Sequence, residues 1–159
     1  MKRSPEWLTA AEDVLIRYCI EFSEVLVDKS KGSYFYTQQG KKVLDFTSGQ
    51  MCSIFGHNHP DIVEALKAGA DSSIHLLSTI LSPPVIDLAY ALNDLLPEQL
   101  SRSMFLSTGS ESNEIAIRMA KLYTDGFEVI GLSGSWHGMT AGAQSSTSSL
   151  TRKNYGPAM

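Results

Sequence analysis

Residues 103–114 read SMFLSTGSESNE and indicate the fold class of the chain. The apolar middle of 103–107 predicts a short buried strand, and the glycine within 108–110 predicts a turn after it. Residues 111–123 then predict a helix, and residues 127–132 predict a second buried strand. A strand, a helix and a strand at this spacing predict a right-handed βαβ unit with parallel strands.

The predicted βαβ unit needs elements that cover both faces of its sheet, and the sequence does not predict enough of them. Parallel sheets normally bury both of their faces, and residues 144–159 show no periodic pattern that would supply a cover. We therefore expect an incomplete α/β fold, the first part of a larger architecture.

Further upstream, two β-like runs predict a hairpin. Residues 33–37 and 42–46 contain aromatic and β-branched side chains, and Gly40 lies between them at a place that suits a positive φ. The stretch from Gly49 to Gly56 shows no periodicity and is expected to be irregular.

Three other segments predict helices. Helix-start residues and an apolar stripe indicate a helix over 10–21, whose stripe is expected to serve core or subunit packing. Pro60 and Pro83 each stand where a first helical residue is expected, which predicts helices over 60–70 and 83–96.

Composition restricts the class of protein. The 159 residues are 43% hydrophobic and 19% charged and carry a formal net charge of −4, which is ordinary for a globular domain. An acidic chain without a Lys/Arg cluster is not expected to bind nucleic acid or an anionic membrane. No apolar stretch approaches the roughly 20 residues that span a bilayer, and no secretory signal is recognisable. We expect a cytoplasmic protein, in which Cys19 and Cys52 are too few for a disulfide scaffold.

The turn Thr108-Gly109-Ser110 is a candidate anion site. It lies at the start of a predicted helix, where free backbone N–H groups and the helix dipole favour an anion. Gly109 lets an oxyanion approach the main chain, and the Ser110 hydroxyl adds a donor. Because the Walker and G-x-G-x-x-G patterns are absent, a single phosphate is the expected ligand. The alternative is that Ser110 is an ordinary N-cap.

Residues 134–138 (GSWHG) directly follow the second predicted strand. Ligands gather at the carboxyl ends of strands in open α/β sheets, so this loop is expected on the same rim as the Thr108 turn. Trp136 has the freedom to lie flat on a planar ligand, and a packing anchor is the alternative. His57 and His59 lack further ligands at a recognisable spacing, so they are expected to fix a loop or cap a helix rather than bind a metal.

Four motifs, taken in order, resemble the class III pyridoxal-phosphate-dependent aminotransferases. They are residues 44–51 (LDFTSGQM), 56–60 (GHNHP), 107–114 (STGSESNE) and 135–138 (SWHG). Within that class, residues 45–51 and 135–140 most resemble the 2,2-dialkylglycine decarboxylases. The order and spacing of the motifs make the resemblance specific.

The resemblance implies fold type I of the pyridoxal-phosphate-dependent transferases, the aspartate aminotransferase-like fold. It implies that residues 1–56 form a helix and β-hairpin segment of the small domain, and that residues 57–159 form the first part of the cofactor-binding large domain. It also implies a homodimer or higher oligomer. The implied activity is amino-group transfer from an amino acid to a keto acid, with or without decarboxylation.

Roles for individual residues also come with the resemblance. Gly109 and Ser110 match the positions that hold the phosphate of pyridoxal 5′-phosphate, and Thr108 stands at the junction of strand and phosphate cup. Trp136 matches the aromatic residue stacked on the pyridine ring. Gln50 matches a residue near the substrate carboxylate, which an amide can bind without neutralising it.

Ser78 matches a position near an alkali-metal site of the family. The family's Schiff-base lysine, the acidic partner of the pyridine nitrogen and the carboxylate-binding arginine match no residue here, so the isolated chain is expected to be inactive. One alternative is a catalytically inert truncated homologue that binds phosphate or a full-length partner. Another is an unrelated small phosphate-binding α/β domain.

Overall fold

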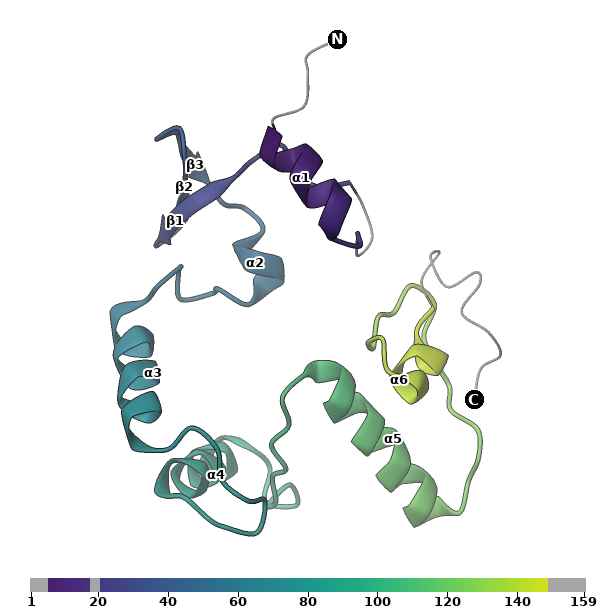
Figure 1. The fold of residues 1–159 in the computed structure, drawn as a ribbon. Coiled ribbons are helices and arrows are strands. Elements are labelled where there is room, and N and C mark those ends of the chain that lie inside the picture. The colour runs from purple at the N-terminus through teal and green to yellow at the C-terminus, as the bar shows by residue number, and fades with distance from the viewer. Residues whose placement is uncertain (1–5, 18–20, 149–159) are drawn as a thin grey trace. The chain divides into compact units, whose positions relative to one another are not determined.

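The computed structural model describes residues 6–17 and 21–148 of the chain (Figure 1). The chain forms two compact units, residues 1–78 and residues 79–159. Each unit is built mainly from contacts between its own residues.

The first unit begins with the helix α1 (Glu6–Val14). The sequence predicts this helix over 10–21, and both bounds are wrong. The carboxylate of Glu6 lies in the first turn, where the helix dipole favours it, so the helix starts earlier. At the other end residues 15–17 are not helical, and Val14 and Leu15 of the predicted apolar stripe are 79% and 56% exposed. Cys19 lies outside the described residues.

A three-stranded antiparallel sheet follows, in the strand order β1-β2-β3. Its strands are β1 (Val27–Lys31), β2 (Tyr34–Thr37) and β3 (Lys42–Leu44). The predicted hairpin is confirmed by β2 and β3, in which Phe35 lies opposite Val43, and Gly40 has a φ of +76° in the turn. The strand β1 was not predicted from the sequence, because its residues are mostly polar and only the pairing with β2 makes it a strand.

Three helices follow the sheet. They are α2 (Ser48–Met51) and α3 (Pro60–Ser72) in the first unit and α4 (Pro83–Leu95) in the second. The predictions made from Pro60 and Pro83 are confirmed, since the N–H that proline lacks would have no partner in a first helical turn. The short α2 lies in the stretch predicted to be irregular and has non-helical backbone angles at Gly49 and Gln50.

The second unit also contains α5 (Gly109–Thr124) and α6 (Ala141–Ser146), which contact each other (Figure 1). The helix predicted over 111–123 is confirmed as α5, and it begins two residues earlier. The helix α6 was not predicted from the sequence, because its residues AGAQSS show no apolar periodicity.

The strands predicted over 103–107 and 127–132 are absent from the described structure. A strand is defined by backbone hydrogen bonds to a neighbour, and neither segment has such a neighbour among residues 21–148. Phe127 is 78% exposed and Ile130 is 94% exposed. The parallel βαβ unit predicted from this spacing is therefore not formed within the described part of the chain.

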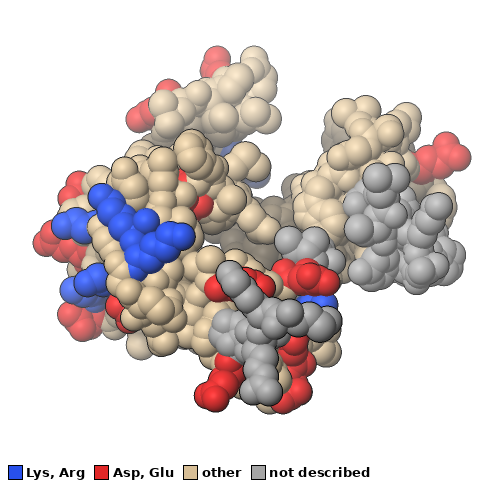
Figure 2. Space-filling model, turned by 90° about the horizontal axis from the view of Figure 1, so that it is seen from above, with Lys and Arg blue, Asp and Glu red and all other residues tan. Residues whose placement is uncertain are grey.

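Apolar side chains remain largely uncovered in both units. Among the described residues, Leu8 and Ala143 are the buried apolar side chains, while Phe46 and Tyr123 are more than nine-tenths exposed. Charged side chains of both signs lie on the face shown in Figure 2. None of the helices within the described ranges has the length and apolar character needed to cross a membrane.

Candidate functional site

The first turn of α5 is held by a capping box. Thr108 occupies the N-cap position, and its Oγ1 accepts a hydrogen bond of 3.2 Å from the backbone N–H of Glu111. In return, Oε2 of Glu111 accepts from the N–H groups of Thr108 at 3.0 Å and Ser107 at 3.1 Å. The alternative that Ser110 is the N-cap is therefore wrong. Gly109 and Ser110 become the first two residues of the helix, where N–H groups have no acceptor within the helix.

Neither the space around residue 109 nor its backbone conformation requires a glycine there. A Cβ atom built on it would meet no atom within 4 Å, and its φ is not in the left-handed region. Alanine in a helix is more stable than glycine by about 1 kcal/mol. A glycine here does leave the first N–H of the helix open to an approaching anion, which the helix dipole attracts. The residues at this turn thus fit a phosphate group.

The loop that carries Trp136 is hydrogen-bonded to the first turns of α5. Oγ of Ser110 accepts from the backbone N–H of Met139 at 3.1 Å. Nδ2 of Asn113 donates to the carbonyl oxygen of His137 at 2.7 Å. Gly138 is buried against the helix, because a Cβ atom on it would lie 2.7 Å from Cβ and 2.8 Å from Cα of Ser110. The structure thus brings the two predicted segments of this unit together.

A second attachment lies one turn further along α5. The carboxylate of Glu114 accepts from Oγ1 of Thr140 at 2.7 Å and from the backbone N–H groups of Gly142 at 3.1 Å and Ala143 at 3.0 Å. The Thr140 hydroxyl, followed by the Ala143 and Gly142 N–H groups, lowers the pKa of Glu114 below its ordinary value. Glu114 therefore stays ionised at the N-terminus of α6.

The indole of Trp136 is 52% exposed although the backbone on both sides of it is held. The carbonyl oxygen of Ser135 accepts from the N–H of Ser148 at 3.1 Å. On the other side, the N–H of His137 donates to Oγ1 of Thr147 at 3.0 Å. The backbone on both sides of Trp136 is thus held in place while its ring remains half exposed.

Gln50 lies in the first unit, on a turn with left-handed backbone. The φ angles from Ser48 to Met51 are 42°, 59°, 59° and 68°, and only Gly49 among these residues is a glycine. Each non-glycine residue in this conformation costs roughly 1–2 kcal/mol. The turn is closed by hydrogen bonds from Met51 N–H to the Thr47 carbonyl at 3.0 Å and from Ser53 N–H to the Ser48 carbonyl at 2.9 Å. Gln50 itself is exposed.

The segment with the strained turn begins at Asp45 and ends at His57, and the side chains of these two residues contact each other. Oδ2 of Asp45 lies 2.8 Å from Nε2 of His57, and these side chains are 8% and 20% exposed. Oδ1 of Asp45 accepts from the N–H and the hydroxyl of Thr47 at 2.8 Å and 2.7 Å. The Thr47 side chain, followed by His57, lowers the pKa of Asp45 to about 2. His57 also forms a backbone bridge with Gly32, so it fixes this loop.

Asp45→Asn is expected to weaken the acid dependence of folding. A carboxyl group with a lowered pKa stabilises the folded state above its ordinary pKa of 3.8, and this contribution is lost as the pH falls through about 2. The free energy of urea unfolding between about pH 5 and pH 2 should therefore fall less steeply in the variant than in the wild type. Asp28→Asn, at an exposed site of β1, serves as the control. Equal slopes for Asp45→Asn and the wild type would contradict the prediction.

The other predicted positions lie apart from these contacts. His59 occupies the N-cap position of α3 without a side-chain capping bond, and Ser78 is exposed in a turn at the end of the first unit. The described residues contain no group of three or more His, Cys, Asp or Glu side chains that could hold a metal ion.

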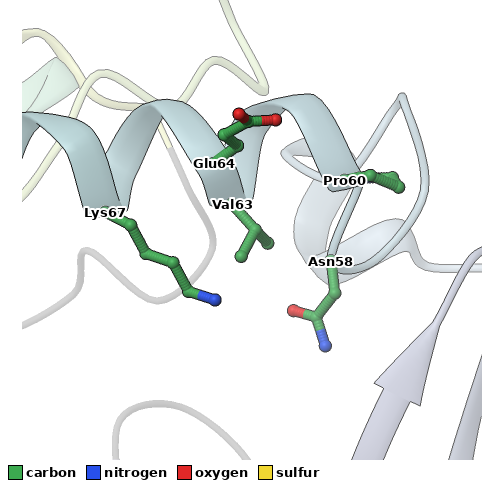
Figure 3. Close-up of a pocket in the computed structure, with 5 residues that line it drawn as sticks. All are labelled: Asn58, Pro60, Val63, Glu64 and Lys67. Atoms are coloured by element: carbon green, nitrogen blue, oxygen red, sulfur yellow. The ribbon is translucent and has the colours of Figure 1, made fainter.

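A shallow pocket of about 650 Å³ lies beside α3 (Figure 3). Its lining residues are Asn58, Pro60, Val63, Glu64 and Lys67. The side chains of Val63, Lys67 and Asn58 project to one side of the helix, while Glu64 projects to the other. Nδ2 of Asn58 already donates to the Ser30 carbonyl oxygen at 2.8 Å, so this pocket shows no convergent set of free polar groups.

Several residues with structural roles at these sites, among them Asp45 and Glu114, were not identified from the sequence. Asp45 and Glu114 both stand in the quoted motifs, but neither was given a role. Their partners lie 12 residues away for Asp45 and 26 to 29 residues away for Glu114. No spacing rule within one helix or hairpin connects such positions, so only the folded chain reveals the pairs.

Similar sequences cover the chain almost completely. A family model described as Aminotransferase class-III matches residues 20–159. An aminotransferase of Schizosaccharomyces pombe is 48% identical over 149 residues, which are 94% of this chain and 33% of the relative. The acetylornithine aminotransferase of Methanopyrus kandleri is 32% identical over 117 residues, 74% of this chain and 30% of the relative. The chain spans about a third of the length of these relatives.

Solved structures show the same fold. The taurine:2-oxoglutarate aminotransferase of Bifidobacterium kashiwanohense, in complex with PLP and glutamate, is 28% identical, and the match has a TM-score of 0.85 over 96% of this chain and 35% of that chain. The adenosylmethionine-8-amino-7-oxononanoate aminotransferase of Methanocaldococcus jannaschii is 29% identical, with a TM-score of 0.78 over 87% of this chain and 35% of that chain. These matches confirm the expected fold type I, of which the described residues form a part. The chain belongs to the class III aminotransferase family.

Proposed function

We propose that this chain supplies the phosphate-binding and ring-contacting part of the cofactor site in a pyridoxal-phosphate-dependent aminotransferase. The enzyme would transfer an amino group from an amino acid to a keto acid. The observation that carries the proposal is the attachment of the Trp136 loop to the first turns of α5. It joins a half-exposed indole to the helix start at Gly109 and Ser110, and a flat ring with a phosphate group fits both features.

Each residue of this junction has a distinct task. The N–H groups of Gly109 and Ser110 bind phosphate oxygens at the positive end of the helix dipole. The Ser110 hydroxyl accepts from Met139, so its own hydrogen is left to donate to the phosphate. Thr108 fixes the start of α5, and with it the phosphate-binding turn, through the capping box. The indole of Trp136 covers the ring. The bound cofactor supplies an electron sink, and the protein supplies orientation and electrostatics.

We extend the proposal to Gln50 as the residue that binds the substrate carboxylate. Left-handed backbone at non-glycine residues often marks functional sites, because surrounding structure must hold it in place. An amide that orients the carboxylate would influence whether decarboxylation or simple amino transfer follows, so activity like that of the 2,2-dialkylglycine decarboxylases belongs to the proposal. Ser78 is proposed near an alkali-metal ion.

The whole enzyme is proposed to include parts that these 159 residues do not supply. The chain spans about a third of its relatives, and none of its lysines matches the lysine that would bond to the cofactor. We therefore propose that this lysine, the acidic partner of the pyridine nitrogen and the substrate-binding arginine come from other residues of the enzyme, which would act as a cytoplasmic homodimer or higher oligomer. The isolated chain is then proposed to be inactive.

A titration with pyridoxamine 5′-phosphate tests the proposed site. This probe has the phosphate and the ring but no aldehyde, so it cannot react with surface lysines. In a Trp7→Phe background Trp136 is the only tryptophan, and stacking of the ring is expected to quench its fluorescence. Pyridoxamine without phosphate is expected to bind at least about 10-fold more weakly, because it lacks the charge-assisted hydrogen bonds at the helix start.

The outcomes separate the proposals. Saturable quenching by the phosphorylated probe, and its competition by inorganic phosphate, would support the cofactor site. Equal quenching by both probes would mean that the phosphate is not bound at Gly109 and Ser110. Absence of quenching at millimolar probe would contradict the site and favour the inert homologue.

A further inference from the structure

We propose that Glu114 and Asn113 are positioning residues that hold the Trp136 loop against α5, so that the place of the indole is set before any ligand binds. The inference rests on the proposed function for its purpose, because it assigns the loop to the ring of the cofactor. The attachment itself is a property of this chain and can be tested without a cofactor.

Three polar side chains on one face of α5 carry the attachment. Ser110, Asn113 and Glu114 stand at positions i, i+3 and i+4, which lie on the same side of a helix. Their partners lie close together in residues 137–143: Asn113 binds at residue 137, Ser110 at residue 139, and Glu114 at residues 140, 142 and 143. One face of α5 thus forms hydrogen bonds with most of the residues from 137 to 143.

Among these three side chains, Glu114 forms the strongest contacts with the Trp136 loop. It is partly buried, and its two carboxylate oxygens accept from three donors. Hydrogen bonds to a charged acceptor are stronger than bonds between neutral groups. The close fit depends on Gly142, since a Cβ atom there would lie 2.7 Å from Oε1 and 3.0 Å from Cδ of Glu114. No other acidic side chain of the described residues accepts hydrogen bonds from this segment.

Asn113 carries the attachment to the residue next to the indole. Its bond to the His137 carbonyl, at 2.7 Å, spans 24 residues of sequence. Trp136 precedes this carbonyl directly, and the His137 N–H is held from the other side by Thr147. Loss of the Glu114 contacts should therefore free residues 140–143 first and transmit greater motion to Trp136 through the short backbone between them.

The experiment measures the indole without any ligand. In the Trp7→Phe background, acrylamide quenching and fluorescence anisotropy report the accessibility and mobility of Trp136. Glu114→Gln keeps the shape of the side chain but replaces one of its two acceptor oxygens with an NH2 donor. The variant can therefore keep either the bond from Gly142 or the bonds from Thr140 and Ala143, and it loses the others. We expect the quenching constant to rise about twofold and the anisotropy to fall, while the helical circular dichroism signal stays unchanged.

Matched variants make the result specific. Glu128→Gln removes the same charge at an exposed site of this unit and should leave the quenching unchanged. Thr140→Val removes one donor from the opposite side of the contact and should raise the quenching in the same direction. The effects of the two substitutions should be less than additive in the double variant, because both disrupt the contact between the Glu114 carboxylate and residue 140. If Glu114→Gln does not fold, Thr140→Val still tests the contact.

Each outcome bears on one proposal. Quenching of Trp136 that is unchanged in both Glu114→Gln and Thr140→Val would overturn the positioning role, whether or not the phosphorylated probe binds. If quenching increases in these variants but the protein does not bind pyridoxamine 5′-phosphate, the proposed function is contradicted and the positioning role is supported. Where the probe binds, its affinity should fall about 3- to 10-fold in Glu114→Gln, and Asn113→Ala should act in the same direction.

Discussion

Gly138→Ala is expected to destabilise the junction between the Trp136 loop and α5 by roughly 2–4 kcal/mol. The new methyl group would lie 2.7 Å from Cβ and 2.8 Å from Cα of Ser110, and real Cβ atoms do not come that close. The helix backbone cannot turn aside as a flexible side chain would. In addition, Gly138 has a φ of +132°, which side-chain-bearing residues rarely adopt.

Urea unfolding followed by the fluorescence of Trp136, in the Trp7→Phe background, measures this effect. Gly134→Ala is the matched control in the same loop, because Gly134 has a φ of +77° but no atom within 4 Å of a built Cβ. It should show only the backbone cost, about 1 kcal/mol. If the two variants lose the same stability, the close approach of Gly138 to α5 is not the reason for its glycine.

Gly109→Ala is expected to change folding and binding in opposite directions. The methyl group meets no protein atom within 4 Å, and alanine favours the helix, so stability should rise by about 0.5–1 kcal/mol. The Cα–Cβ bond of a helical residue tilts toward the N-terminus of its helix. The methyl group would therefore stand where a phosphate oxygen must approach, and affinity for pyridoxamine 5′-phosphate should fall by about 10-fold or more.

Calorimetric titration with this probe and urea unfolding give the two readouts separately. Gly69→Ala is the control, because Gly69 lies within α3 and also has open space around a built Cβ. It should raise stability by a similar amount without changing probe affinity. An affinity that stays unchanged in Gly109→Ala would remove this residue from the phosphate cup, while the loop attachment would stand.

Local sequence patterns predicted the elements whose causes are themselves local. The prolines at residues 60 and 83 start α3 and α4, and the glycine at residue 40 turns the hairpin between β2 and β3. The motifs around Gly109 and Trp136 also indicated the family, because the order and spacing of such motifs are read directly from the chain. Helix starts, tight turns and motif order depend on a few neighbouring residues.

Only the tertiary structure decided the features that depend on distant residues. The segments 103–107 and 127–132 have strand-like sequences, yet a strand exists only where a neighbour accepts and donates its backbone hydrogen bonds. In the same way β1 has an unpromising sequence and becomes a strand through β2. The partners of Asp45 and Glu114 belong to this class as well, since a carboxylate binds whichever donors the fold brings to it. The sequence alone determined the family and the candidate residues, and the fold determined which of them hold one another in place.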